Sequence, residues 1–295
     1  MNKTTFKYWI EAMRLRTLPV SAAGVITASG CALADNSFRP LPALMCLIFA
    51  ILAQISSNFA NEYYDFKGGL DKKGREGPRR GVTEGDISPK AMLAATYLTL
   101  AIACIIGLSL LLFGGWWLIP VGIAVAIGAV AYSAGPYPLS HHGLGEIAVI
   151  AFFGLVPVCC TYTLQTGHLP LPVVAMALAT GLMGANVLII NNYRDIDDDR
   201  AVGKQTLAVK FGPAAMRMLY LFNSMAAIAL AMTCNSNVNT TALATTCGIY
   251  GIGAVAIVTL MGKLNGRRLT PLLGATAMLM LLFSTAWAII AAAAR

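Results

Sequence analysis

The sequence predicts an all-α membrane protein: a bundle of nine transmembrane helices that forms one domain over residues 1–295, with its N-terminus in the cytoplasm. Hydrophobic residues make up 57% of the chain and charged residues only 12%, and the mean hydropathy is +0.70. A soluble domain carries about 25% charged residues. Because no water satisfies backbone groups in the bilayer core, the apolar segments are expected to be helices.

Nine apolar runs are long enough to cross the hydrocarbon core, which needs about 20 residues. They lie at roughly residues 17–34, 40–60, 91–113, 116–134, 145–166, 172–192, 218–234, 240–262 and 270–293. None has a Lys or Arg in its middle. We therefore expect a polytopic protein embedded in a lipid bilayer.

The basic residues support this topology. When nine helices are threaded from a cytoplasmic N-terminus, all 21 Lys and Arg residues except Arg39 and Arg295 fall on the cytoplasmic side. Such an asymmetry is typical of membrane proteins. The net charge of +8 therefore reflects orientation in the membrane, and we expect no nucleic-acid partner.

The second apolar run ends in a polar motif. Its stripe consists of Gln54, Asn58, Asn61 and Asp65, spaced so that all four share one helical face. A polar stripe near the end of a transmembrane helix is costly unless it faces a cavity or a partner. Gly68 and Gly69 should end the helix and let Asp71 fold back towards Asp65.

The sixth run ends in a second acidic motif, on the same predicted face of the membrane. It contains Asn191, Asn192, Asp195, Asp197, Asp198 and Asp199. Carboxylates this close repel one another unless a cation neutralises them. Mg²⁺ suits such a site, since it takes hard oxygen ligands and binds through one or two carboxylates plus substrate phosphates.

Basic side chains near both motifs complete the expected chemistry. They include Lys67, Arg79, Arg80, Arg194 and Lys204. Carboxylates, Mg²⁺ and cations on one surface form a diphosphate site, because the metal bridges phosphate oxygens to carboxylates and the cations balance the remaining charge. We expect Asp65, Asp71, Asp195 and Asp199 to hold Mg²⁺.

These motifs resemble those of the UbiA-type superfamily of intramembrane aromatic prenyltransferases, which have nine transmembrane helices. The superfamily's first motif has the form N-D-x-x-D with a further Asp, and its second has the form D-x-x-x-D. The matching positions here are Asn61, Asp65, Asp71, Asp195 and Asp199. Glu62 stands where the superfamily usually has Asp, so Asp65 and Asp195 are the preferred ligands.

Within the superfamily the chain is most similar to the 1,4-dihydroxy-2-naphthoate polyprenyltransferase branch, through residues 16–19, 61–68, 77–81, 135–146 and 191–207. The resemblance implies Mg²⁺-dependent transfer of a polyprenyl group from polyprenyl diphosphate to that aromatic acceptor. Loss of CO₂ would give demethylmenaquinone, in menaquinone biosynthesis. It also implies a bacterial cell inner membrane, with the active site facing the cytoplasm.

Further site residues follow from these expectations. Asn58, Asn61 and Asn192 would orient ligands or phosphate, Lys67, Arg79 and Lys204 would contact diphosphate, and Tyr132 would line the acceptor pocket. His141 and His142 are interpreted as an interfacial loop pair, and Glu146 as a residue that opens a helix.

Two alternatives stay open at this point. The same fold could prenylate another aromatic acceptor, such as 4-hydroxybenzoate. A cation-coupled transporter would also carry intramembrane polar residues, although its ionisable groups should lie near the bilayer midplane. The prenyl chain length and the oligomeric state cannot be read from the sequence.

Overall fold

The computed structural model describes residues 3–74, 76–234 and 238–294, so Arg295, one of the two basic residues assigned to the far side of the membrane, lies outside it. This part of the chain is helical, with no strand. The N-terminal half contains α1 (Lys3–Met13), α2 (Leu18–Ala34), α3 (Pro40–Lys67), α4 (Gly81–Glu84), α5 (Pro89–Ser109), α6 (Leu111–Gly114) and α7 (Leu118–Ala131). The second half contains α8 (Gly145–Val149), the π-helix η3 (Ile150–Leu155), α9 (Val156–Thr166), α10 (Leu171–Arg194), α11 (Ile196–Ala201), α12 (Leu207–Met232), α13 (Thr240–Met261) and α14 (Thr270–Ala293). Short 3₁₀ segments η1 (Leu15–Thr17), η2 (Leu139–His141) and η4 (Gly266–Leu269) connect them.

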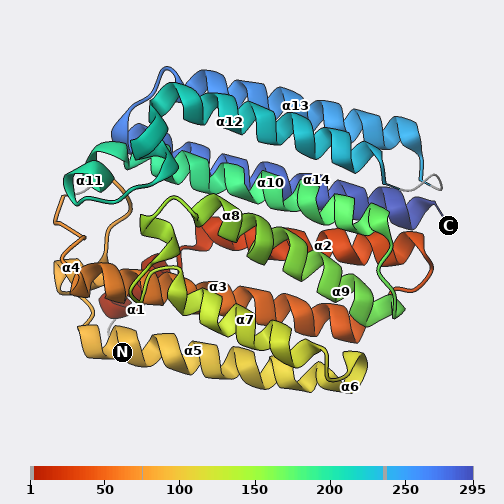
Figure 1. Ribbon diagram of the computed structural model, residues 1–295, viewed down its shortest axis with the longest axis horizontal. Coiled ribbons are helices and arrows are strands. Elements are labelled where there is room, and N and C mark those ends of the chain that lie inside the picture. Colours follow the sequence, from red (N-terminus) through yellow and green to blue (C-terminus); the bar gives the residue numbers. More distant parts are fainter. Residues whose placement is uncertain (1–2, 75, 235–237, 295) are drawn as a thin grey trace.

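The helix count agrees with the prediction of a nine-helix bundle. Within the described residues, eight helical segments are long and apolar enough to cross a membrane, and α7 is a shorter apolar helix of 14 residues. Successive long helices alternate in direction, so the loops after α3 and α10 lie at the same end of the bundle, beside α4 and α11 (Figure 1). The two acidic motifs therefore meet, as the topology predicted.

Local sequence signals explain where several helices begin and end. Ser88, Thr206 and Asn239 cap α5, α12 and α13 by accepting hydrogen bonds from backbone amides in the first turn. At the end of α3, Gly68 is the C-cap, and Gly69 follows with a left-handed φ of 68°. The predicted end of this helix is thereby confirmed.

Two helices are longer than the apolar runs that predict their membrane crossings. The apolar run at 40–60 continues as helix to Lys67, so α3 is about 42 Å long. The last turns of α3, which carry the first acidic motif, thus reach the edge of the hydrocarbon core. In α12 the chain breaks at Gly212 (φ 79°) before Pro213, and the predicted span at 218–234 corresponds to the segment after this break.

α10 lies at the centre of the bundle and packs against α2, α9, α12 and α14 (Figure 1). Its contact with η3 is possible only because both helices have glycine there. A Cβ added at Gly154 would lie 2.4 Å from the Cα of Gly181. Small residues of this kind let transmembrane helices approach closely. The main apolar core joins α2, α9, α10, α12, α13 and α14.

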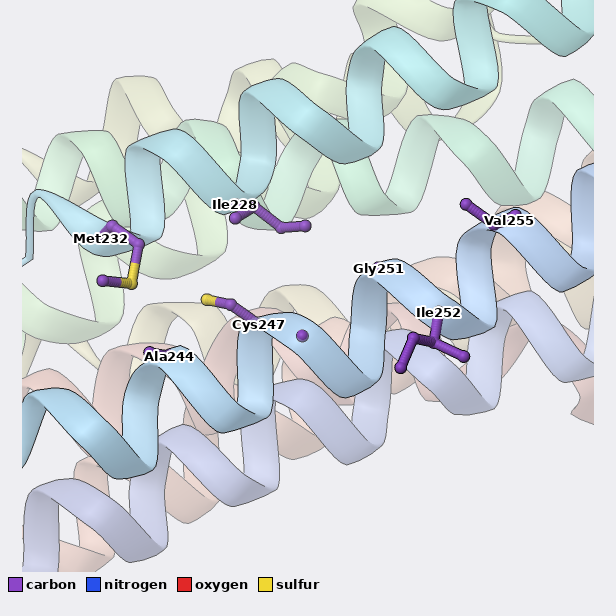
Figure 2. Close-up of a pocket in the computed structure, with 8 residues that line it drawn as sticks. Ile228, Met232, Ala244, Cys247, Gly251, Ile252 and Val255 are labelled. Atoms are coloured by element: carbon purple, nitrogen blue, oxygen red, sulfur yellow. The ribbon is translucent and has the colours of Figure 1, made fainter.

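Away from the acidic motifs, a shallow groove runs between α12 and α13 (Figure 2). It is lined by Ile228, Met232, Ala244, Cys247, Gly248, Gly251, Ile252 and Val255. The exposed side chains of Ile252 and Val255 belong to the outer surface of the bundle. This lining has no charged side chain, so the groove offers nothing that would bind a diphosphate.

Candidate active site

The polar stripe of α3 has two functions in the structure. Its first members hold the N-terminal segment, because Gln54 donates a hydrogen bond to the carbonyl of Thr17 at 3.0 Å and Asn58 donates one to the carbonyl of Met13 at 2.9 Å. Its last members, Asn61 and Asp65, are buried at the end of the bundle where the motifs meet. Asn58, predicted to orient ligands, therefore contacts the backbone that precedes α2.

Asn61 organises the first motif. Its Oδ1 accepts hydrogen bonds from Arg80, at 3.0 Å, and from Arg14. Its Nδ2 donates to Oδ2 of Asp65, at 3.3 Å, and to Oγ of Ser133, at 2.9 Å. Four segments of the chain thus converge on one amide.

Asp65 is only 1% exposed and is surrounded by cationic and polar side chains. Nε2 of His141 lies 3.3 Å from its Oδ1, and Nζ of Lys204 lies 3.1 Å from its Oδ2. Arg80 lies 3.9 Å from Oδ2 of Asp65 and, through Nε, 3.3 Å from Oδ2 of Asp71. Asp71 therefore does return to Asp65, and the two carboxylates share one guanidinium.

The second motif is built around the end of α10. Arg194 binds both carboxylate oxygens of Asp195, at 2.6 and 2.9 Å, and donates to Oδ1 of Asn191 at 2.8 Å. Oδ2 of Asp198 accepts a hydrogen bond from the backbone amide of Glu76, in the loop after α3, at 2.8 Å. The two motif loops are thereby tied to each other.

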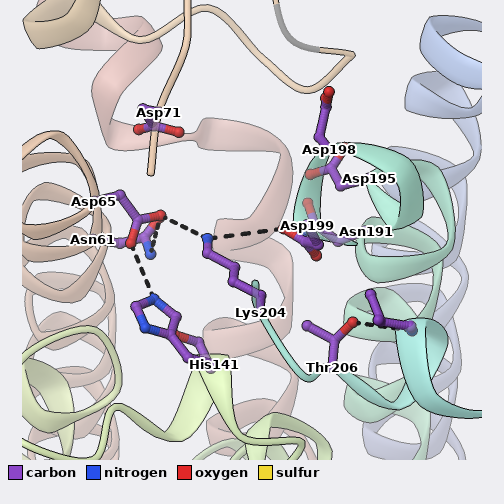
Figure 3. A network of polar contacts seen from close by, with 12 residues as sticks. Asn61, Asp65, Asp71, His141, Asn191, Asp195, Asp198, Asp199, Lys204 and Thr206 are labelled. Carbon is purple, nitrogen blue, oxygen red and sulfur yellow. Dashed lines mark hydrogen bonds and ion pairs between the residues drawn. The ribbon is translucent and has the colours of Figure 1, made fainter. Parts of the chain in front are cut away.

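Lys204 bridges the two motifs. Its Nζ lies 3.1 Å from Asp65 and 3.8 Å from Asp199, so one ammonium group spans carboxylates that belong to α3 and α11 (Figure 3). The figure shows Asn61, Asp65 and Asp71 on one side of this group and Asn191, Asp195 and Asp199 on the other. The structure thus brings the four predicted Mg²⁺ ligands to one polar surface.

Not every predicted diphosphate contact lies at this surface. Arg79 pairs with Asp86 and stacks 4.7 Å over the ring of Tyr8, and the hydrogen bond that Arg79 donates to Asp86 raises the pKa of Arg79. Lys67 is exposed at the end of α3. The buried guanidinium between the acidic side chains belongs to Arg80 instead. Because Arg79 and Arg80 are adjacent basic residues, the sequence does not indicate which of them contacts the acidic side chains, and only the fold distinguishes them.

The other predicted residues lie at the border of the site. Asn192 donates a hydrogen bond to Oε1 of Glu146 at 3.0 Å. Glu62 accepts a hydrogen bond from the amide of Val82 at 3.0 Å, and thus fixes the backbone that follows Arg80. His141, interpreted from sequence as an interfacial loop residue, instead contacts Asp65, and no spacing in the sequence indicates that contact.

An apolar cavity of about 300 Å³ lies inside the bundle, and Gln54 of the polar stripe on α3 is among its lining residues. It lies between α2, α3, α5, α7 and η3, and its lining includes Phe49, Gly122, Tyr132, Val149 and Phe152. Tyr132 connects the two regions, since it lines the cavity and lies within electrostatic range of Asp65 and Asp199. A charged head group and an apolar chain could therefore be bound side by side.

The donor set fits Mg²⁺ in its chemistry. The candidate ligands are carboxylate and amide oxygens, with no thiolate among them. Within the described residues, no three acidic, His or Cys side chains converge closely enough to hold a metal by themselves. This suits a cation that takes part of its coordination from water and substrate phosphate.

A bundle of membrane-crossing helices, with a surface of acids and cations above an apolar cavity, defines an integral membrane enzyme of the prenyltransferase class. The chain belongs to the UbiA prenyltransferase family, whose profile matches residues 23–271. Membership in this family, with the acids clustered at one end of the bundle, excludes the cation-coupled transporter.

Relatives and solved structures agree with this assignment. The chain is 39% identical, over 75% of each sequence, to 1,4-dihydroxy-2-naphthoate octaprenyltransferase of Escherichia coli. It is 38% identical to the protein of the same name from Mycobacterium tuberculosis, over 73% of this chain and 74% of that one. A UbiA homologue from Archaeoglobus fulgidus, solved with GPP and Mg²⁺, has the same fold with a TM-score of 0.70, at 14% identity over 97% of this chain and 99% of that one.

Proposed function

We propose that this protein transfers a polyprenyl group from polyprenyl diphosphate to 1,4-dihydroxy-2-naphthoate, with loss of CO₂, to give the hydroquinone form of demethylmenaquinone in menaquinone biosynthesis. The observation that carries the proposal is the bridge of Lys204 between Asp65 and Asp199, two carboxylates that lie within electrostatic range of Tyr132, a lining residue of the apolar cavity. The names of the curated relatives support the choice of acceptor.

The chain's own residues bind the diphosphate. Asp65, Asp71, Asp195 and Asp199 would hold Mg²⁺, which neutralises the charge that develops on the departing diphosphate. Lys204, Arg80 and His141 bind phosphate oxygens, and Asn61 and Asn192 hold neighbouring side chains in place. Lys67 meets the diphosphate at the exposed rim, whereas Arg79 stays with Asp86.

The cavity supplies what the carbon chemistry requires. The allylic C–O bond breaks as diphosphate leaves, and the electron-rich ring carbon forms the new C–C bond. The ring carboxylate then leaves as CO₂, which returns its electron pair to the ring. Apolar walls beside Tyr132 bind the prenyl chain and exclude water, which would otherwise capture the allylic cation.

We also propose that the protein resides in a bacterial inner membrane with the acidic motifs facing the cytoplasm. The long helices support its integral membrane nature. Lys67 and Arg194 end α3 and α10, and Arg80 and Lys204 lie in the loops next to α4 and α11, which are at one end of the bundle (Figure 1). This basic excess supports a cytoplasmic orientation for that end.

The test uses purified protein in detergent with farnesyl diphosphate, 1,4-dihydroxy-2-naphthoate and Mg²⁺. Prenylated product and released CO₂ are measured together. Mg²⁺-dependent product with matching CO₂ supports the proposal. Prenylation of 4-hydroxybenzoate, with no turnover of the naphthoate, would keep the reaction class and overturn the acceptor.

A further inference from the structure

A buried carboxylate beside the site has an oxygen with no hydrogen-bond partner among the described residues. Glu146, at the start of α8, is 5% exposed, and its Oε1 accepts a hydrogen bond from Asn192. Its Oε2 is buried and forms no hydrogen bond within the described part of the chain. Leaving a buried polar atom unpaired is costly, so an atom of this kind calls for a partner that binds there.

The neighbours of Glu146 indicate where such a partner would lie. Its charge acts on Tyr132, and the backbone at Gly145 lies against the Tyr132 hydroxyl, which is 3.4 Å from an added Cβ. Val149, one helical turn after Glu146 and on the same face, lines the apolar cavity together with Tyr132. Glu146 does not itself line the cavity, but it lies next to two residues that do, Tyr132 and Val149, and on the side of Asn192.

Tyr132 adds a second polar group at this place. The Tyr132 hydroxyl forms no hydrogen bond with another residue that the structure describes; only the backbone oxygen of Tyr132 accepts one. Tyr132 also lines the cavity. A ligand that matches both groups has a flat apolar body and carries a hydroxyl at its edge. A prenyl chain offers no such hydroxyl, whereas a dihydroxylated aromatic ring does.

We propose that Glu146, flanked by Tyr132, binds a hydroxyl of the aromatic acceptor and so determines which acceptors are used. This inference rests on the proposed function and extends it to the acceptor side of the site. The Oε2 atom accepts the hydrogen bond from the ring hydroxyl. A carboxylate on the acceptor is repelled from Glu146 and turns towards the cations Lys204 and Arg80, which orients the ring in the site.

This arrangement selects by hydroxyl groups. A site built to hydrogen-bond a hydroxyl rejects an analogue that lacks it, because the buried oxygen is then left unpaired. The expected discrimination thus arises at one atom. It can be measured separately from donor binding, which depends on the acidic motifs.

The test compares wild-type protein with Glu146→Gln, which keeps the size of the side chain but removes its charge. Acceptors are 1,4-dihydroxy-2-naphthoate, 1-hydroxy-2-naphthoate and 4-hydroxy-2-naphthoate, with farnesyl diphosphate and Mg²⁺ held constant. We expect kcat/KM for the dihydroxy acceptor to fall about tenfold or more, as loss of a charged hydrogen bond implies, with the KM for farnesyl diphosphate unchanged. One of the two monohydroxy acids lacks the hydroxyl that Glu146 binds. For that acceptor, the kcat/KM of the wild type divided by the kcat/KM of Glu146→Gln should approach one.

Glu62→Gln is the matched control, since it removes the charge of another buried carboxylate, whose hydrogen bonds involve the backbone of Val82 and Gly81. Its ratio of kcat/KM between the three acceptors should equal that of the wild type. If Glu146→Gln does not fold, Tyr132→Phe removes the neighbouring hydroxyl and should alter the same acceptor ratio.

The inference would be overturned if Glu146→Gln lost the same fraction of kcat/KM with all three acceptors, or if it had an increased KM for farnesyl diphosphate. Glu146 would then have only a structural role. Failure of the wild type to use 1,4-dihydroxy-2-naphthoate would instead overturn the proposed function. The two failures are thus distinguishable in one set of assays.

Discussion

Two adjacent arginines allow a sharp test of the site. Arg80 is 6% exposed, lies 3.3 Å from Asp71, and donates a hydrogen bond to Asn61 at 3.0 Å. At an effective dielectric constant of about 20, unit charges at 3.3 Å attract each other by about 5 kcal/mol before desolvation is subtracted. Removing one partner of such a buried pair costs about 3–5 kcal/mol, because the other charge is left uncompensated.

Arg80→Gln should therefore reduce activity far more than Arg79→Gln, although the two residues are neighbours in sequence. If about 3 kcal/mol of the lost interaction acts on the bound diphosphate, kcat/KM for the donor falls about 100-fold. The Arg79 side chain is 41% exposed and is paired with Asp86, so its variant should retain most of its activity.

The assay measures donor kcat/KM for both variants, with thermal unfolding in detergent as a control for folding. Both proteins must elute as single species before their rates are compared. Equal losses for the two variants, or full activity of Arg80→Gln, would refute the placement of Arg80 among the acidic motifs.

Four further outcomes are expected. Chelation of divalent cations with EDTA should abolish prenyl transfer, and added Mg²⁺ should restore it; turnover that persists in EDTA would contradict the assignment of the acidic residues. Lys204→Met should lower kcat/KM for the donor about 100-fold or more, measured by product formation, because it leaves Asp65 and Asp199 without their shared ammonium group. Gly122→Phe should lower kcat/KM for long donors more than for dimethylallyl diphosphate, since Gly122 lines the cavity and a Cβ there meets nothing within 4 Å; equal effects on both donors would argue against the cavity as the chain site. Asn186→Leu should lower the thermal unfolding temperature in detergent with little change in KM, because Asn186 hydrogen-bonds Ser224 at 2.9 Å and the backbone of Tyr220 at 3.2 Å, both on α12 and neither part of the motifs.

Much of the fold could be predicted because each transmembrane helix carries its own signal. The length of an apolar run and the charge of the loops decide whether and in which direction a segment crosses the bilayer. The run at 40–60 shows the limit of this signal. Hydropathy falls at Asn58, but the helix continues to Lys67, because the polar side chains of its last turns find partners on other segments.

The site could be predicted in part. Asp65, Asp71, Asp195 and Asp199 stand out because acidic residues are rare in this chain, and they do lie at one polar surface. Their cationic partners were harder to find. Arg80 and Arg79 both lie in the short loop before α4, and they differ only in which of the two side chains faces the bundle. His141 contacts Asp65 from a loop 76 residues away in sequence.

The sequence by itself determined the class of this protein, the number of its membrane crossings and the end of the bundle at which its acids gather. These depend on local hydrophobicity and charge, which are properties of short segments. Only the tertiary structure decided that Lys204 spans the two motifs and that Arg80 rather than Arg79 is buried with them. It also decided that one oxygen of Glu146, next to Tyr132, has no hydrogen-bond partner in the described part of the chain. Such contacts join residues far apart in sequence, so they depend on how the helices pack and not on any single segment.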